Sequence, residues 1–222
     1  MKNIEGTIKA RHSVRKFTDK QIGKELVEQL NTIIKGCNNE GKLNIQLVLN
    51  DRETFDKSLL HYGKIQNASD YLAMVGEKCE NLEEKIGYYG EKIVLEAQEL
   101  GLNTCWVAGT YNKGSVKATI KENEKLICII AIGYGENQGK PHKGKEFNDV
   151  SVTKNVPEWY KKGIEYALLA PTAINQQRFK FELSGNTVSV KPGIGPMTKI
   201  DMGIVKYHFE LGAGKENFKW SE

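Results

Sequence analysis

Hydrophobic residues recur along this chain in two rhythms, one typical of amphipathic helices and one of half-buried strands. Helical spacing predicts helices over residues 19–35, 54–60, 80–100, 158–170 and 201–211. Alternation or short apolar runs predict strands over residues 43–49, 71–75, 126–132, 179–183 and 187–190. Together these elements indicate an α+β fold, with helices packed against a mixed or antiparallel sheet.

Glycine and proline mark most of the expected helix ends. The first long helix is expected to end at Gly36 and the polar turn 38–41, and the last helix at Gly212. The fourth helix should stop before Pro171, because a residue that precedes proline disfavours helical geometry. Ser184-Gly185-Asn186 is a hairpin signal between the last two strands.

The chain carries traces of an internal repeat. Segments 90–101 and 201–212 share Ile-Val and Glu-Leu-Gly in register, and the helix-turn-strand units 26–49 and 163–183 match in pattern. Two matches in the same order predict a partial internal duplication. We therefore expect a single domain over residues 1–222, with a first half of about 1–150 and a second half of about 155–222.

Composition excludes several classes of protein. The net charge of +4 comes from 32 basic and 28 acidic residues spread along the chain, without the basic block that nucleic-acid binding favours. The longest apolar run, 126–132, is far shorter than the roughly 20 residues of a membrane span. No secretory signal opens the sequence, and four scattered cysteines predict reduced thiols and no metal site. We expect a cytoplasmic protein without nucleic-acid or membrane partners.

Two of the four arginines lie in Arg11-His12-Ser13-Val14-Arg15, which we call the arginine segment. In an extended chain Arg11, Ser13 and Arg15 share one face, and in a helical turn the two arginines still do. Two guanidinium forks and a hydroxyl suit a phosphate at one end and a polarised carbonyl at the other. The alternative is a solvated basic segment.

Three further segments could carry chemistry. Residues 170–177, which we call the amide loop, offer short side chains, amides and backbone N–H groups to a planar ligand, or form an ordinary helix-to-strand turn. Residues 101–109 end in small residues that let a backbone approach a ring, and Cys105 within them is more typical of a buried filler than of a nucleophile. Residues 140–145, the basic turn, could grip a phosphate or be a solvated loop.

Taken together, these segments resemble the FMN-dependent nitroreductase family. Residues 11–17 resemble its RxSxRxF opening, 170–177 its APSAxNxQP loop, and 99–106 its AxxxGLGTCW helix end. Residues 132–135, followed by the basic turn, resemble its late GYP strand and phosphate turn. The resemblance implies the nitroreductase fold.

The order of these segments departs from the family pattern. In the family the amide loop follows the second helix, whereas here it comes about 135 residues later. Family members are homodimers that bind FMN between subunits. The resemblance therefore implies the internally duplicated subgroup, a monomer that imitates the dimer and binds one FMN per chain.

The resemblance also implies a role for each matching residue. The phosphate end of FMN would be held by Arg11 and Ser13, with His12 in the same segment and with Lys143 and Lys145 closing on it. Arg15 would approach the pyrimidine carbonyl, and a backbone N–H from Val107, Ala108 or Gly109 would reach the flavin N5. The ring and ribityl would be lined by Pro171, Thr172, Ala173, Asn175 and Gln177. Lys64, and more weakly His61, would contact the ring; Arg178 replaces the last proline of the loop motif.

The implied activity belongs largely to the cofactor. NADH or NADPH would pass hydride to the flavin N5, and a nitroaromatic, quinone or similar small acceptor would then take it. No protein nucleophile or general base is required. One alternative is a non-catalytic FMN-binding protein that stores flavin or senses redox state, and another is an anion- or nucleotide-binding module without flavin.

Overall fold

The computed structural model describes residues 3–56 and 65–221. It divides into two compact units, one of Met1–Leu82 with Lys92–Pro141 and one of Glu83–Glu91 with His142–Glu222. Among the residues described, no helix combines the length and the apolar character needed to cross a bilayer.

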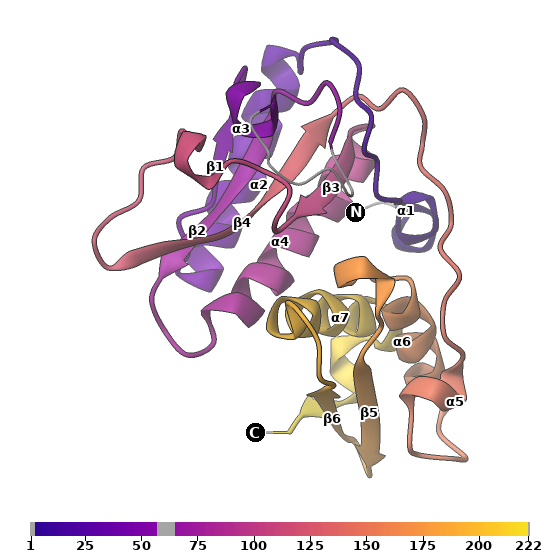
Figure 1. The fold of residues 1–222 in the computed structure, drawn as a ribbon. Coiled ribbons are helices and arrows are strands. Elements are labelled where there is room, and N and C mark those ends of the chain that lie inside the picture. Colours follow the sequence, from indigo (N-terminus) through magenta and orange to yellow (C-terminus); the bar gives the residue numbers. More distant parts are fainter. Residues whose placement is uncertain (1–2, 57–64, 222) are drawn as a thin grey trace. The chain divides into compact units, whose positions relative to one another are not determined.

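A four-stranded antiparallel sheet in the order β1-β2-β4-β3 forms the centre of the first unit (Figure 1). Its strands are β1 (Gln46–Val48), β2 (Tyr71–Glu77), β3 (Asn103–Val107) and β4 (Glu124–Gly133). The apolar runs of β2 and β4 are almost wholly buried, and these strands occupy the interior positions of the sheet. The predicted α+β class is thus confirmed, although β1 is shorter than expected and β3 was not predicted.

The helices of the first unit are α1 (Ile4–Ala10), α2 (Lys24–Gly41), α3 (Glu53–Asp56) and part of α4 (Leu82–Glu99), with a short 3-10 turn η1 (Lys113–Ser115). The predicted end of the first long helix at Gly36 was wrong, because α2 continues to Gly41 and ends at Lys42 in the left-handed region. Cys37 is buried, and the Asn38 amide exchanges two hydrogen bonds with the backbone of Ile45, so the polar turn expected there is anchored as helix.

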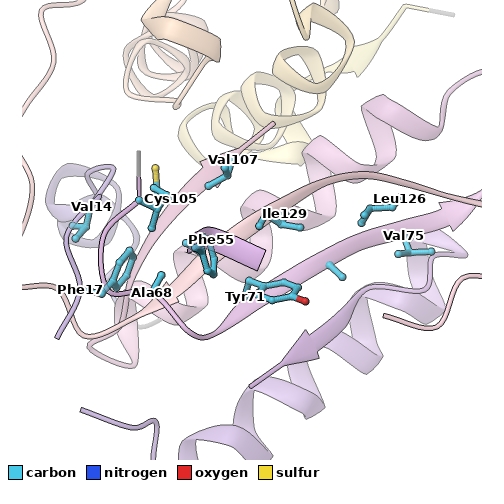
Figure 2. Close-up of a cluster of buried hydrophobic side chains, with 13 residues drawn as sticks. Val14, Phe17, Phe55, Ala68, Tyr71, Val75, Cys105, Val107, Leu126 and Ile129 are labelled. Carbon is cyan, nitrogen blue, oxygen red and sulfur yellow. The ribbon is translucent and has the colours of Figure 1, made fainter. Parts of the chain in front are cut away.

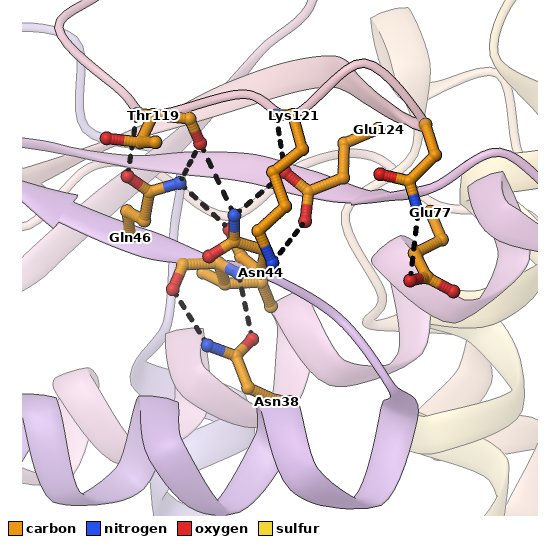
Figure 3. A network of polar contacts seen from close by, with 9 residues as sticks. Asn38, Asn44, Gln46, Glu77, Thr119, Lys121 and Glu124 are labelled. Carbon is orange, nitrogen blue, oxygen red and sulfur yellow. Dashed lines mark hydrogen bonds and ion pairs between the residues drawn. The ribbon is translucent and has the colours of Figure 1, made fainter.

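Side-chain hydrogen bonds and a buried hydrophobic cluster both stabilise the first unit. Asn44 and Gln46 bind the Thr119 backbone, and Asn44 also donates to Glu124, as Figure 3 shows. A buried cluster around Tyr71 and Phe17, drawn in Figure 2, includes Val14, next to the arginine segment's charged residues. The arginine segment is therefore fixed to the core through one of its own residues.

The second unit contains α5 (Phe147–Val150), α6 (Glu158–Leu168), η2 (Ala173–Asn175), β5 (Phe179–Ser184), β6 (Thr187–Pro192), α7 (Thr198–Ala213), η3 (Lys215–Asn217) and β7 (Lys219–Trp220). Helices α6 and α7 lie side by side next to the β5–β6 hairpin (Figure 1). The hairpin turns at Gly185, whose φ is +61°, as predicted, and β7 adds in parallel to β6. Rings of Phe209, Phe181, Phe218 and Trp220 pack together in its core.

Glycines of α7 allow close helix packing instead of ending the helix. The predicted end at Gly212 was wrong: α7 continues to Ala213 and is followed by Gly214, whose φ is +74°. A Cβ on Gly212 would lie 2.4 Å from the carbonyl oxygen of Lys162 in α6. Likewise, a Cβ on Gly203 would lie 1.9 Å from the carbonyl oxygen of Glu84 in α4. Both positions need glycine because another backbone approaches them.

Candidate functional site

The arginine segment is extended and runs beside β3. Ser13 forms a parallel bridge with Thr104, and the Val14 amide donates to the Thr104 carbonyl at 3.0 Å. Of the two conformations considered from the sequence, the extended one is therefore present. Arg11 is buried, Ser13 half-buried and Arg15 exposed, so the segment carries its charge from the interior to the surface.

Cys105 lies among these groups without being activated by them. Burial raises the pKa of its thiol, although the charges of Arg15 and Arg11 and a hydrogen bond to Ser13 act in the opposite direction. A thiol with a raised pKa stays protonated and is a poor nucleophile. Cys105 therefore fills space beside the arginine segment, as its sequence context predicted.

The backbone that follows β3, the strand beside the arginine segment, is exposed. Val107 is buried at the end of β3, whereas Ala108 and Gly109 are exposed in a bend. Gly139 packs against the arginine segment so closely that a Cβ at position 139 would lie 2.6 Å from the Cβ of His12. Because the φ of Gly139 is +76°, this close approach depends on glycine.

In the second unit the basic turn and the amide loop are joined through Gln177. The buried Gln177 side chain accepts the Lys145 amide at 2.6 Å and donates to the Leu168 carbonyl at 2.7 Å. The Lys145 ammonium donates to the Gln177 carbonyl at 2.8 Å, and the Asn175 amide donates to the Lys143 carbonyl at 2.9 Å. The structure thus places Lys143 and Lys145 directly against the amide loop.

The amide loop has an unusual backbone. Ile174, Asn175 and Gln177 have φ values of +48°, +54° and +43°. A positive φ costs of order 1–3 kcal/mol at a non-glycine residue, and a β-branched residue such as Ile174 is a clear outlier there. Its side chain is nevertheless 76% exposed. Local contacts must therefore hold the loop in this conformation.

Asp201, in the first turn of α7, supplies two of these contacts. Its carboxylate accepts the Ala173 amide at 3.0 Å and the Gln176 side-chain amide at 2.7 Å. Burial raises the pKa of Asp201 to about 6, although both hydrogen bonds favour the charged form. Sequence reasoning placed Asp201 at the start of a helix and gave no signal of its contact with a loop 25 or more residues away.

The predicted site residues thus form two groups in different units. The first unit holds Arg11, His12, Ser13 and Arg15 beside the strand that leads to Val107, Ala108 and Gly109. The second unit holds Lys143 and Lys145 with Pro171, Thr172, Ala173, Asn175 and Gln177. Lys64 and His61 lie outside the described residues. Sequence reasoning did not indicate Gly139 or Asp201, and it included Gln176 only as a member of the amide loop.

Solved structures with the same fold include three bacterial proteins named as nitroreductases or oxidases. A putative nitroreductase from Thermotoga maritima matches with a TM-score of 0.70 and 22% identity, over 95% of this chain and 83% of that one. A putative NADH dehydrogenase/NAD(P)H nitroreductase from Bacteroides thetaiotaomicron has a TM-score of 0.53 and 17% identity, over 66% and 95% of the two chains. A putative NADH oxidase from Clostridium acetobutylicum has a TM-score of 0.52 and 22% identity, over 67% and 99%.

The family of this chain follows from a match to one family model. A comparison with curated proteins finds no match to this chain. The model of the family described as "Putative TM nitroreductase" matches residues 3–213, nearly the whole sequence. The chain therefore belongs to this nitroreductase family, and its α+β architecture is the nitroreductase fold.

Proposed function

We propose that this protein is an FMN-dependent oxidoreductase that transfers hydride from NADH or NADPH to nitroaromatic, quinone or similar small acceptors. Membership of a nitroreductase family supports an oxidoreductase function. The observation that carries the proposal further is the arginine segment, where two guanidinium groups and a hydroxyl flank the strand that leads into an exposed backbone bend.

The residues of the first unit fit the chemistry of FMN. Arg11 and Ser13 would hold the phosphate, because guanidinium forks and hydroxyls are strong donors to phosphate oxygens. Arg15, which is exposed, would donate to the pyrimidine carbonyl and favour negative charge on the ring. A backbone N–H of residues 107–109 would face N5. FMN, when bound, supplies the hydride-transfer chemistry that no side chain in this set can supply.

In the second unit the amide loop offers small groups to a planar ligand. Pro171, Thr172 and Ala173 are half-buried and short, and Asn175 is exposed with its amide bound to the basic turn. Lys143 and Lys145 would add positive charge for the phosphate. Gln177 is 2% exposed and its side chain is fully engaged, so we assign it to supporting the loop and the basic turn.

We also propose one FMN per chain and an internally duplicated, monomeric architecture in the cytoplasm. The sequence has one arginine segment and one amide loop. The Bacteroides thetaiotaomicron and Clostridium acetobutylicum neighbours are covered over 95% and 99% of their own chains, yet they match only 66% and 67% of this chain. The remaining third is what a second, abbreviated half would contribute.

Substitution of one arginine tests the assignment. Arg15→Ala should weaken FMN binding about 10- to 100-fold, because a hydrogen bond to a charged group contributes about 1.5–3 kcal/mol. Arg52→Ala is the matched control, since Arg52 is an exposed arginine that pairs with Asp19. Binding is measured by titration of the apoprotein with FMN. Equal affinity in the two variants would contradict the role of the arginine segment.

Absorbance spectra under anaerobic conditions test the activity. Purified protein should show the oxidised flavin bands, which bleach with NADH or NADPH and return when menadione or nitrofurazone is added. Flavin that stays oxidised with both donors would instead support an FMN-storing or redox-sensing protein. A protein that binds no FMN would leave only an anion- or nucleotide-binding module.

A further inference from the structure

Asp201 connects α7 to both ends of the strained part of the amide loop. Its Oδ1 accepts the backbone amide of Ala173 at 3.0 Å, and its Oδ2 accepts Nε2 of Gln176 at 2.7 Å. Ala173 and Gln176 bracket Ile174 and Asn175, the two consecutive residues with positive φ. One buried carboxylate therefore fixes the residues on either side of the strained pair.

Gln176 extends this connection to a second segment. Its Nε2 also donates to the Pro196 carbonyl at 2.7 Å, just before α7 begins. The Arg178 guanidinium donates a hydrogen bond to the Ile194 carbonyl, and the Arg178 carbonyl accepts one from the Gly193 amide. The amide loop and residues 193–197 are thus held side by side, with Asp201 bound to the side chain that joins them.

A neutral group in place of the carboxylate would not make the same contacts. An asparagine at position 201 could still accept the Ala173 amide, but its NH₂ group would face the NH₂ group of Gln176. Rotation of the Gln176 amide would relieve that conflict only by turning its oxygen toward the Pro196 carbonyl. Two acceptors would then face each other, so one hydrogen bond is lost either way.

We propose that Asp201 is a positioning residue that holds the amide loop in its flavin-binding conformation through Ala173 and Gln176. That the ligand is a flavin rests on the proposed function, whereas the hold of Asp201 on the loop does not depend on it. Asp201 contacts no reacting group; it acts only through the loop.

This clamp of Ala173 and Gln176 by Asp201 is sensitive to pH near neutrality, because it buries a carboxyl group. Burial raises the pKa of Asp201 to about 6, so opening of the loop, which returns that pKa toward its ordinary value, becomes more favourable as the carboxyl group ionises. Other groups on the packed segments titrate or carry charge as well. They are Arg178 directly after the loop, Lys199 and Lys206 in α7, His142, Lys143 and Lys145 in the basic-turn segment, and Glu84, Lys85 and Tyr88 in the turn of α4 that packs on Gly203. Asp201→Asn isolates the contribution of Asp201 from theirs.

Four variants test the clamp. Asp201→Asn removes one acceptor, and Gln176→Glu places two carboxylates against each other. The double variant restores a donor–acceptor pair of reversed polarity, because Asn at 201 donates to Glu at 176. Asp149→Asn is the matched control: Asp149 also accepts a backbone amide, that of Glu146, at 3.0 Å in the same unit.

Amide hydrogen exchange of residues 171–178 in the FMN-free protein is the primary readout. Each single variant should lower the protection of the loop on the order of tenfold, the scale of one hydrogen bond to a charged group. The double variant should recover part of that loss, and Asp149→Asn should leave loop exchange unchanged. Wild-type protection, corrected for intrinsic rates, should also rise as the pH is lowered from about 7.5 to about 5, whereas that of Asp201→Asn should not.

FMN affinity is the second readout. The dissociation constant of Asp201→Asn should rise on the order of tenfold, with recovery in the double variant. Unchanged loop exchange in Asp201→Asn would overturn the proposal. Wild-type loop exchange that does not depend on pH would also overturn it, and this measurement needs no variant to fold. Absence of FMN binding in the wild type would defeat the proposed function, while the exchange data would still decide the clamp.

Discussion

Gly203→Ala should destabilise the protein strongly, because α7 packs on another helix through that residue. A Cβ there would lie 1.9 Å from the carbonyl oxygen of Glu84 and 2.5 Å from the amide nitrogen of Tyr88. Real Cβ atoms essentially never lie within 3.0 Å of such atoms, so α4 and α7 would have to separate locally by about 1 Å to admit the methyl group. Both facing atoms are backbone, and no rotamer change can remove them.

The expected loss is about 3 kcal/mol, at the upper end of what overpacking usually costs. For a chain of this size that corresponds to a Tm lower by about 6–12 °C. Gly36→Ala is the matched control, because nothing lies within 4 Å of a Cβ at that helical position. It should stabilise the protein by about 0.5–1 kcal/mol, since alanine loses less backbone freedom in a helix.

Urea unfolding followed by tryptophan fluorescence measures both variants. Trp159 and Trp220 report on the second unit and Trp106 on the first, so separate transitions would be visible as a mismatch with circular dichroism. A Gly203→Ala variant within about 0.5 kcal/mol of the wild type would refute the backbone contact between the two helices.

Three further predictions follow from buried groups and glycines. Glu91→Leu should cost about 1–3 kcal/mol in urea unfolding, because it leaves the buried Nε2 of His208, 2.9 Å from that carboxylate, without this partner. Glu91→Gln should cost less, and equal costs would argue against the pair. Gly139→Ala should weaken FMN binding, measured by titration, because its Cβ would meet the arginine segment. Gly101→Ala is the control: Gly101 has a similar φ of +79°, but nothing lies within 4 Å of a Cβ there, so only stability should change. Equal FMN affinities in the two variants would contradict the contact with the arginine segment. Burial raises the pKa of Asp201 from its ordinary value near 3.8 to about 6, so the stability that the neutral carboxyl group contributes is full below about pH 4 and is lost as pH rises through 6. Between pH 4 and 7 the wild type should lose up to about 3 kcal/mol relative to Asp201→Asn, and parallel pH curves would exclude this linkage.

Long apolar patterns predicted most of the fold correctly. The runs in β2 and β4 and the hairpin at Gly185 were predictable because each depends on residues adjacent in sequence. The strand β3 was missed because Asn103 and Thr104, both polar, are buried within it. The Asn103 side chain bonds to the Gly135 amide at 2.9 Å, a partner that only the tertiary structure supplies.

The candidate site was predictable only where its residues form a local motif. The arginine segment and the amide loop could be recognised from consecutive residues, and the extended form of the first is confirmed. The contact of Asp201 with Ala173 joins residues 28 positions apart and depends on how α7 packs, which no local pattern encodes. Glycines were misread for the same reason: Gly212 was interpreted as a cap, although its role is set by the α6 backbone.

The crossing of α4 and α7 is reciprocal. Gly87 of α4 approaches the Ile200 carbonyl, 2.1 Å from its hypothetical Cβ, and Gly203 of α7 approaches the Glu84 carbonyl at 1.9 Å. Each glycine thus meets the residue three positions before the other glycine. Such an exchange of equivalent contacts is the signature of an isologous interface between two copies of one helix.

This reciprocity also tests the proposed duplication, because it defines a register of its own. The contacts relate Glu84 to Ile200, an offset of 116 residues, whereas the match of segments 90–101 and 201–212 has an offset of 111. Five residues are about 1.4 helical turns, so one pair of helices cannot satisfy both registers. If the contact register is the inherited one, Gly87→Ala and Gly203→Ala should cost similar free energies of unfolding. In the other register the counterpart of Gly203 is Lys92, and nothing then requires the two costs to agree; clearly unequal values would remove the contact register as support for duplication.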